Sequence, residues 1–503
     1  FSEEGVQEVS NGSFSEEGVQ EVSNGSFSQE GSELVTNGDF SNGSTGWILD
    51  TGWSVSNEKL NAISVNSTSA ITASFPFVGN SFKVTYTISD YSQGEVRLFL
   101  GGVEQTLDRS ENGTFTEYIT ITSGNTTLYV QGVNNFTGSI DNVSVREVGQ
   151  DWTLATGWSI GEDKATANGA ASLGRSIQQS AMVVGKNYKL TFDVTDYTSG
   201  DVRILVLGPQ TVINSTGSYT VYGTATSNLV RFYSNSFNGS ITNISVKEVG
   251  MDWDLSGLTT IGDDVASFVD NGTNANSSVI QDNVVLPNTT YQLTFDIVRY
   301  ALGALQISVG NSSYINDNLA QGVGTYSLYV TSGAGSRIEI KRNGLVPNFD
   351  FDITNISVKE VGQNWQEKSG VIVSVDSSGL VFDNSIGNAT AGAFQNIGLS
   401  DGKKYRMTAT MQLLTGASNG NFALQTSTAI GSGQSLVYLG QSLVVGGAAV
   451  TETFEFTPAL GDVSVQLSCN EANATFKISN ISVIEITDDT NLPRINYENF
   501  SYQ

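Results

Sequence analysis

A seven-residue pattern, Asn-(Val/Ile)-Ser-Val-x-Glu-(Val/Ile), recurs four times along this chain of 503 residues. Apolar and polar residues alternate in each copy, which is typical of a β-strand with one buried face. The copies lie roughly one hundred residues apart, the size of one small domain. The pattern therefore predicts four domains of similar fold, each containing one copy, at Asn142–Val148, Asn243–Val249, Asn355–Val361 and Asn480–Ile486.

The ends of these domains are marked as well. A glycine follows each of the first three copies, and Trp152, Trp253 or Trp365 stands three residues after that glycine. Connections this short favour a fairly fixed relation between neighbouring domains. We expect short β repeats at residues 1–32, four sandwich domains at 33–149, 150–250, 251–362 and 363–487, and a C-terminal tail at 488–503.

A second landmark lies in the middle of each domain. These stretches alternate with period two, and short Gly-, Asn- and Ser-rich turns separate them from further strand-like runs. No segment keeps a helical period of 3.6 residues. The sequence therefore predicts an all-β chain of serial antiparallel β-sandwiches, each a jelly roll, from the landmarks Phe82–Gly94, Tyr188–Gly200, Tyr291–Gly303 and the weaker Tyr405–Leu414.

A shorter repeat opens the chain. Residues 1–13 read FSEEGVQEVSNGS, residues 14–26 are identical, and residues 27–40 form a looser third copy. Each unit has a strand-like stretch followed by Asn-Gly, a pair typical of tight turns. Thirteen residues cannot bury a core, so these units must stack on each other, on the next domain or on another chain. Because unpaired strand edges attract partners, we expect residues 1–32 to dock onto other subunits of a larger oligomeric assembly.

Composition excludes several functions. The chain has no histidine and a single cysteine, Cys469, so catalytic triads, His-ligated metals and an intrachain disulfide are impossible. With 23 Lys and Arg against 50 Asp and Glu, the net charge is −27, which argues against binding to nucleic acid. No apolar run approaches the ~20 residues of a membrane span. Cys469 itself lies in an alternating stretch and is expected to be buried.

Catalysis has little support in the sequence. Without histidine, a carboxylate pair of the kind that hydrolyses glycosides is the main mechanism left. The carboxylates are scattered, and landmarks shared between domains suit a modular scaffold better than one active site. We therefore expect a protein that is not an enzyme.

Two stretches resemble carbohydrate-binding modules of the galactose-binding-like type. Glu33–Trp47 resembles their opening, and Gly138–Val145 resembles their last strand. The serial domains, the N-terminal leader and the ending Asn491–Tyr497 resemble virion-associated proteins of bacteriophages, of the tail- or head-fibre type. The resemblance implies jelly-roll domains, a location on the virion surface or outside the cell, and other virion or filament subunits as partners.

The resemblance also implies a structural calcium in the first jelly roll. In such modules, an acidic residue near the opening strand and an aspartate on the last strand hold the ion together with backbone carbonyls. Asp39 and Asp141 match these positions. The later domains have Thr242, Thr354 and Ser479 in place of Asp141, so the site is expected only in the first.

Recurring aromatic residues suggest a carbohydrate site. Tyr91, Tyr197 and Tyr300 follow the mid-domain strand, just before a glycine turn. Sugar rings stack on exposed aromatic faces while charged side chains bind their hydroxyls. Packing inside the domain is the competing interpretation, because repeated tyrosines often belong to cores. The polar partners expected for a sugar are Asp90, Asp196, Arg97 and Arg203.

Two functions follow from these features. The first is a non-enzymatic structural virion protein, a phage fibre or decoration segment made of tandem β-sandwiches, with contacts to host-surface glycans as an added role. The alternative is a phage or bacterial surface adhesin, a lectin-like array whose weak carbohydrate contacts gain strength through multivalency.

Overall fold

The structure is a computed structural model. It describes residues 4–74, 80–100, 104–121, 127–170, 174–208, 210–270, 272, 276–315, 322–344, 346, 348–362, 364–368, 372–376, 379–383, 392–428, 435–469, 471 and 473–486.

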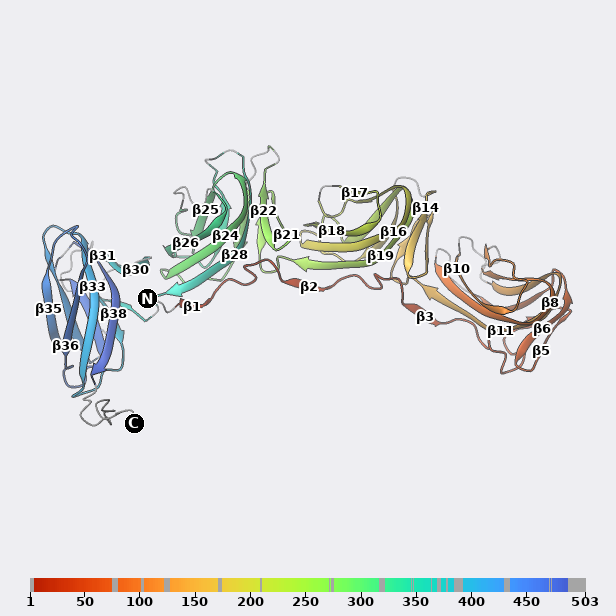
Figure 1. Ribbon diagram of the computed structural model, residues 1–503, viewed down its shortest axis with the longest axis horizontal. Helices are drawn as coiled ribbons and strands as arrows, with labels where there is room; N and C mark the ends of the chain where they lie inside the picture. The colour runs from red at the N-terminus through yellow and green to blue at the C-terminus, as the bar shows by residue number, and fades with distance from the viewer. Residues whose placement is uncertain are drawn as a thin grey trace, which may run out of the picture. The chain divides into compact units, whose positions relative to one another are not determined.

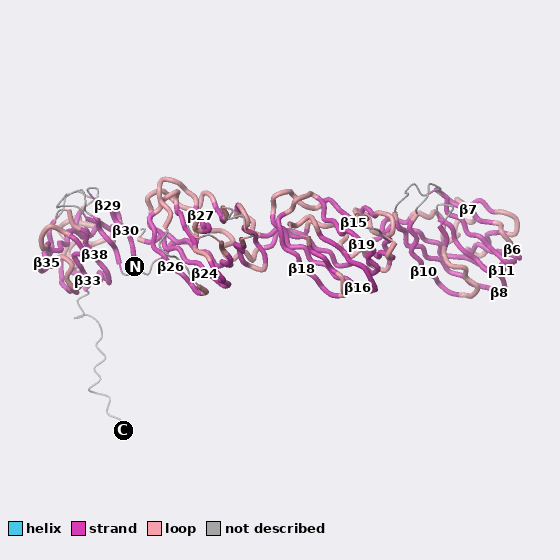
Figure 2. The backbone as a smooth tube through the Cα atoms, turned by 90° about the horizontal axis from the view of Figure 1, so that it is seen from above, coloured by secondary structure: helices cyan, strands magenta, loops and turns pink. Residues whose placement is uncertain are grey.

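The chain divides into two compact units. Unit 1 comprises residues 1–13, 252–259 and 265–503, and unit 2 comprises residues 14–251 and 260–264. The regular elements of the described residues are β-strands, drawn in magenta in Figure 2. The described part of the chain holds no helix with the length and apolar character that crossing a membrane requires.

Jelly roll 1 is built around two long antiparallel strands, β8 and β11. Its sheet runs in the order β10-β8-β11-β6-β5, with β3, β4, β7 and β9 paired at its sides. The strands are β3 (Glu30–Glu33), β4 (Ile48–Leu49), β5 (Trp53–Ser56), β6 (Lys59–Val65), β7 (Ser69–Ser74), β8 (Ser81–Leu100), β9 (Glu104–Gln105), β10 (Gly113–Thr120) and β11 (Thr127–Val148).

Jelly roll 2 repeats this plan. The order β12-β15-β19-β14-β13 is extended by β16, which pairs with β17, β18 and β19. The strands are β12 (Thr153–Leu154), β13 (Trp158–Gly161), β14 (Lys164–Asn168), β15 (Arg175–Ser180), β16 (Asn187–Ile204), β17 (Thr211–Ile213), β18 (Gly217–Thr224) and β19 (Leu229–Val249), with β2 (Glu17–Gln20) at one edge.

Jelly roll 3 shows the two layers of a sandwich as separate sheets. One contains the order β22-β28-β24-β26 with β1 at its side, and the other is β20-β23-β27-β25. The strands are β1 (Glu4–Gln7), β20 (Asp254–Ser256), β21 (Thr259–Gly262), β22 (Val265–Val269), β23 (Ser278–Gln281), β24 (Thr290–Leu302), β25 (Leu305–Val309), β26 (Gly324–Thr331), β27 (Ile338–Arg342) and β28 (Asp350–Val361).

Jelly roll 4 is again two five-stranded sheets, ordered β29-β32-β37-β34-β35 and β30-β31-β38-β33-β36. The strands are β29 (Gln366–Lys368), β30 (Ile372–Asp376), β31 (Gly379–Asp383), β32 (Gly392–Asn396), β33 (Lys404–Thr415), β34 (Gly420–Ser427), β35 (Ser435–Leu443), β36 (Val450–Phe456), β37 (Ser464–Cys469) and β38 (Thr475–Ile486). The all-β prediction of serial antiparallel β-sandwich jelly rolls is confirmed.

The long strands bend at irregular positions. In β8, Asp90 and Gly94 have φ values of 54° and 75°, and Asp196 and Gly200 in β16 have the same values. The register of each strand against its partner shifts here. Such bulges let one strand continue from one layer of a sandwich into the other.

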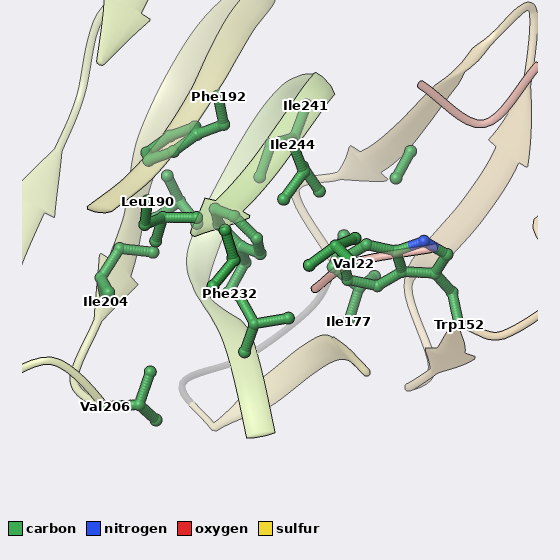
Figure 3. Packing of buried hydrophobic residues seen from close by; sticks show 14 of the residues in the cluster. Val22, Trp152, Ile177, Leu190, Phe192, Ile204, Val206, Phe232, Ile241 and Ile244 are labelled. Atoms are coloured by element: carbon green, nitrogen blue, oxygen red, sulfur yellow. The ribbon is translucent and has the colours of Figure 1, made fainter. Parts of the chain in front are cut away.

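The inward faces of the strands form the cores. The alternation seen in the sequence is the alternation of burial, as in Tyr188, Leu190, Phe192 and Val194 of β16, which are all buried. Figure 3 shows part of this core in jelly roll 2. Cys469 is also buried, as expected, and burial raises the pKa of its thiol.

The N-terminal repeats differ from the expectation. Residues 1–32 were expected to offer strand edges to other subunits, but β1, β2 and β3 pair with β28, β19 and β11 of the same chain. Figure 1 shows each short strand beside the last strand of a different jelly roll. A strand on the same chain is present at high effective concentration, which favours this pairing. Repeat 1 thus serves jelly roll 3, repeat 2 jelly roll 2, and repeat 3 jelly roll 1.

Candidate functional site: the edge of the closing strands

The site common to these jelly rolls is the edge of the closing strand, a term used here for β11, β19, β28 and β38. In jelly roll 2, β15 pairs with the first part of β19, Leu229–Ser234, and β14 pairs with the middle, Asn238–Ile241. The strand β2 covers the last part, opposite Lys247 and Val249. The closing strand therefore has three successive neighbours along one edge, while β16 pairs along the other.

The change of neighbour occurs at the asparagine of the recurring pattern. Asn142, Asn243, Asn355 and Asn480 all have positive φ, between 50° and 53°. Asparagine tolerates this left-handed conformation, and a single such residue in a strand makes a bulge that turns the strand. The pattern that the sequence repeats is thus a bulge followed by a strand edge, which β1, β2 and β3 pair in the first three jelly rolls.

A glutamine side chain continues the ladder where the repeat enters. The Val246 backbone N–H donates to Gln20 Oε1 at 2.8 Å, and Glu21 N–H donates to the Val246 carbonyl at 2.9 Å. In jelly roll 3, the Val358 N–H donates to Gln7 Oε1 at the same distance of 2.8 Å. The side-chain amide supplies the acceptor that a regular strand would provide from its backbone.

The Asn-Gly pair fixes each repeat by close approach. The Ile244 N–H donates to the Gly25 carbonyl at 2.9 Å, and the Trp152 indole N–H donates to the Asn24 carbonyl at 3.1 Å. A Cβ on Gly25 would lie 1.9 Å from the Ile244 carbonyl oxygen. The other two repeats do the same, with Trp253 on Asn11, Trp47 on Asn37, and 1.9 Å at both Gly12 and Gly38. The predicted tight turn is confirmed, since the Phe27 and Phe40 N–H groups donate to the Asn24 and Asn37 carbonyls at 3.1 and 3.3 Å. The same Asn-Gly pair is also a contact point on the closing strand.

A buried glutamine holds the residue before that pair. Gln179 Oε1 accepts the Ser23 N–H at 2.7 Å, and Gln179 Nε2 donates to the Ser23 carbonyl at 3.0 Å. Gln281 contacts Ser10 in the same way, at 2.9 and 3.0 Å. Both glutamines are buried, so each pair of bonds satisfies polar groups that water cannot reach.

Apolar burial adds to these bonds. Val22 and Phe27 of the repeats are buried in the core of jelly roll 2. Figure 3 shows Val22 beside Trp152 and Ile177. The Phe27 ring lies 5.3 Å from that of Trp152 between centroids. Burial of one such side chain stabilises by about 1.5–3 kcal/mol, so the repeats belong to the cores.

Ion pairs lie at the strands of repeats 2 and 3. Glu17 lies 2.5 Å from the Lys189 ammonium and 3.0 Å from that of Lys247, and hydrogen bonds from these lysines lower the pKa of its carboxyl. In jelly roll 1, Glu30 lies 2.5 Å from Lys83. These groups are about one-third exposed, so the pairs contribute modestly.

The tyrosines predicted to bind sugar have a shared structural role. Each hydroxyl donates to the carbonyl of the glycine three residues later, at 3.1, 3.0 and 2.8 Å for Tyr91, Tyr197 and Tyr300. The rings of Tyr91 and Tyr197 also pack partly buried against their cores. These contacts close the bulge of the mid-domain strand and match the packing interpretation. Sugar binding here stays a prediction.

The charged residues expected beside them are engaged in separate contacts. Asp90 pairs with Lys59 at 3.1 Å and Asp196 with Lys164 at 3.0 Å, and these lysines lower the pKa of both carboxyls. Arg203 pairs with Asp201. Arg97 contacts Gln131, Asp108 and the Phe99 ring, so the structure does not bring its charged group onto Tyr91.

The predicted calcium ligands have local hydrogen bonds. Asp39 Oδ1 accepts the N–H and hydroxyl of Ser41, at 3.2 and 3.0 Å, which lowers the pKa of its carboxyl. Asp141 accepts the Asn142 N–H at 2.6 Å. The described residues contain no group of three or more acidic or cysteine side chains arranged to hold a metal. Calcium binding by Asp39 and Asp141 stays a prediction.

Two comparisons with known proteins found no match: no protein-family model and no curated protein matches this chain. Among solved structures, the chain is similar to the CBM22-1-CBM22-2 tandem domain of Paenibacillus barcinonensis Xyn10C, with 10% identity and a TM-score of 0.22 over 47% of this chain and 94% of that one.

Two further structures are similar at the same level. The triple jelly-roll protein of an archaeal virus turret has 14% identity and a TM-score of 0.18, over 80% of this chain and 90% of that one. The xanthan lyase of Paenibacillus has 9% identity and a TM-score of 0.20, over 87% and 53%. Similarity this low supplies no argument about function, which has to come from the chain's own residues.

The Gly25→Ala substitution should release repeat 2 from jelly roll 2. Its Cβ meets the Ile244 carbonyl, so strand and repeat must separate at an expected cost of about 1–3 kcal/mol. Hydrogen exchange of residues 17–25 should accelerate. Gly344→Ala is the control, because a Cβ there meets no atom within 4 Å. Equal exchange in both variants would contradict the close-approach role.

Acid should weaken the docking of repeat 2. The folded pKa of Glu17 lies below its ordinary value of 4.5, so its stabilisation is complete above that value and is lost as the pH falls through the folded pKa. Hydrogen exchange of residues 17–22 should therefore rise below about pH 4.5, and Glu17→Gln should flatten this rise. Glu111→Gln, an exposed residue of jelly roll 1, is the control. The same pH profile in all three proteins would exclude this ion pair as a determinant.

The calcium prediction has a direct test. If Asp39 and Asp141 hold calcium, the ion at 100 times its Kd should stabilise jelly roll 1 by about 2.7 kcal/mol. Melting curves in calcium and in EGTA measure the difference, and Asp141→Asn should abolish it. Identical curves for the unmodified chain would remove the site.

Proposed function

We propose that this chain is a non-enzymatic structural protein, a segment of a virion fibre or surface decoration, in which an N-terminal ribbon (residues 1–40) braces serial jelly rolls. One observation carries the proposal. Each 13-residue repeat completes the closing strand of a different jelly roll, with the same backbone, indole and carboxamide contacts where the side chains allow. Such a ribbon would hold the jelly rolls of the array together.

The connections between the two units support a bracing role. Repeat 1 belongs to unit 1 with jelly rolls 3 and 4, whereas repeats 2 and 3 belong to unit 2. The chain therefore passes from one unit to the other at residues 13–14, 251–252, 259–260 and 264–265. Each extra connection restricts the unfolded chain and keeps a partly opened domain near its neighbours.

The chemistry of the described residues supports a role without catalysis. The chain offers no histidine, and the recurrent carboxylates Asp90, Asp196 and Glu17 are neutralised by lysines. Contact with host-surface glycans is the less supported part of the proposal, because the tyrosine hydroxyls already donate within the chain. The virion-surface or extracellular location rests on the resemblance of the repeats to phage proteins.

Deletion of residues 1–26 tests the bracing. Without repeats 1 and 2, the backbone N–H groups of Ile244 and Val246 in jelly roll 2 lose their acceptors, and so do those of Ile356 and Val358 in jelly roll 3. These amides should exchange faster, and each of the two jelly rolls should lose about 1.5–3 kcal/mol because the deletion removes a buried valine, Val22 or Val9.

Jelly roll 1 supplies the matched control, because the deletion leaves repeat 3 in place. Its Val143 and Val145 amides, bonded to Gly38 and Glu33, should keep their protection. Uniform loss over all jelly rolls, or none, would refute bracing by one repeat per domain. Immunogold labelling of particles from the source, with antibodies against this chain, tests the virion assignment separately, and absence of label would refute it.

A further inference from the structure

Jelly roll 4 has a closing strand without a repeat. Its strand β38 pairs with β31 over Thr475–Ile478 and with β33 along the other edge. The remaining part, Asn480–Ile486, carries the same pattern as the other closing strands and the same left-handed asparagine. No described strand pairs with this part on the side where β1, β2 and β3 lie in the other jelly rolls.

The side chains that hold a repeat are also present. Trp365 occupies the position of Trp152 and Trp253 at the start of the domain. The register Gln366↔Phe394 places Gln395 opposite Trp365, as Thr153↔Gln178 places Gln179 opposite Trp152. Jelly roll 4 thus combines the strand edge, the indole and the carboxamide.

These groups lack the contacts that their counterparts make. Trp47, Trp152 and Trp253 are buried, with at most 8% exposed, whereas Trp365 is half-buried and its indole N–H has no acceptor among the described residues. Gln395 is half-buried, and its carboxamide has no hydrogen bond within the described part of the chain.

The apolar residues of the strand show the same difference. Ile356 and Val358 in β28 are buried, but Ile481 and Val483 at the same positions in β38 are only half-buried. Ile484, 54% exposed, stands where the other strands have Arg146, Lys247 or Lys359. Proteins usually protect open edges with charges or cover them, so an edge with an exposed isoleucine is suited to pairing.

We propose that the Asn480–Ile486 edge binds an extended segment of another polypeptide that carries the 13-residue repeat, antiparallel to β38 and in the register of β2 on β19. Gln395 would hold the backbone of the serine, Trp365 would donate to the asparagine carbonyl, and the glycine would lie against Ile481. This goes beyond the bracing proposal, which stands if the edge proves empty.

The occupant is a partner with a spare repeat rather than a second copy of this chain. Within one copy, the three repeats already pair with β28, β19 and β11. A second copy that lent its repeat to β38 would uncover one of its own closing strands, so the number of paired edges would not rise. A partner whose repeat has no acceptor of its own gains a full set of bonds.

A fluorescent synthetic peptide, FSEEGVQEVSNGS, tests the proposal by anisotropy titration of the full chain. We expect saturable binding of one peptide, and protection of the Ile481 and Val483 amides from hydrogen exchange. A control peptide has alanine in place of the glycine that follows its asparagine. It should bind at least tenfold more weakly, because an added Cβ has no room at Gly12, Gly25 or Gly38 in the three docked repeats. Equal binding of both peptides would overturn the proposal.

Variants of the chain locate the binding. Gln395→Ala and Trp365→Phe should each weaken binding several-fold. Gln210→Ala, at an exposed glutamine of jelly roll 2, is the control and should leave the peptide affinity unchanged. If Gln179→Ala changed the affinity and Gln395→Ala did not, the peptide would be exchanging with the chain's own repeat 2, and the proposal would fail.

Two further outcomes would replace the proposed partner. Sedimentation of the chain alone should show a monomer. A dimer that the peptide converts into monomers would instead show that the β38 edge pairs with a second copy. Peptide binding that appears only after removal of residues 487–503 would assign the edge to the chain's own tail. Either result would overturn the choice of a separate polypeptide.

Discussion

The fold of this chain depends on a closing strand whose edge is only half covered by its own sheet. The left-handed asparagine turns the strand, so that β6, β14, β22 or β31 pairs before it and leaves the next residues open. Backbone donors and acceptors on a strand edge need partners, and apolar side chains beside them need cover. The N-terminal repeats provide both in three jelly rolls, which explains why each combines a strand, a valine and an Asn-Gly pair.

Specific docking comes mainly from carboxamides and backbone groups. Repeats 1 and 2 are identical in sequence, and jelly rolls 2 and 3 present equivalent glutamines, Gln179 and Gln281. Contacts alone therefore distinguish these two sites weakly, and the order of repeats along the tether decides which repeat binds which jelly roll. Repeat 3 differs: Glu33 replaces the strand-end glutamine and lies 3.5 Å from Arg146. In repeats 1 and 2 the uncharged Gln7 and Gln20 stand at this position, so only repeat 3 places a carboxylate there.

The sequence predicted the elements better than their partners. Period-two alternation located the strands, because a strand with one buried face has an apolar residue at every second position. The pairing of β2 with β19 joins residues more than two hundred positions apart, and no local pattern specifies such a contact. Tyr91 and Asp90 recur because they stabilise a bulge. A carbohydrate site uses the same residue types, so the sequence alone does not distinguish the two roles. The sequence analysis did not identify Gln179 and Gln281 as docking residues. Each lies opposite the tryptophan that opens its domain, and this shared position was the available signal.

Jelly roll 4 shows which unit this architecture repeats. A jelly roll that was complete by itself would gain little from a half-buried Trp365 or Gln395 at its seam, since a polar group removed from water costs free energy unless it is hydrogen-bonded. Both residues have a clear use once a repeat lies on the closing strand, as in the first three domains. The repeating unit is therefore a jelly roll together with a 13-residue repeat that contains a short strand, and the repeat comes from elsewhere in the sequence. Separation of the two parts is what would allow one continuous ribbon to brace several domains, as proposed. It also leaves β38 of jelly roll 4 without a described strand beyond Ile478 on this edge.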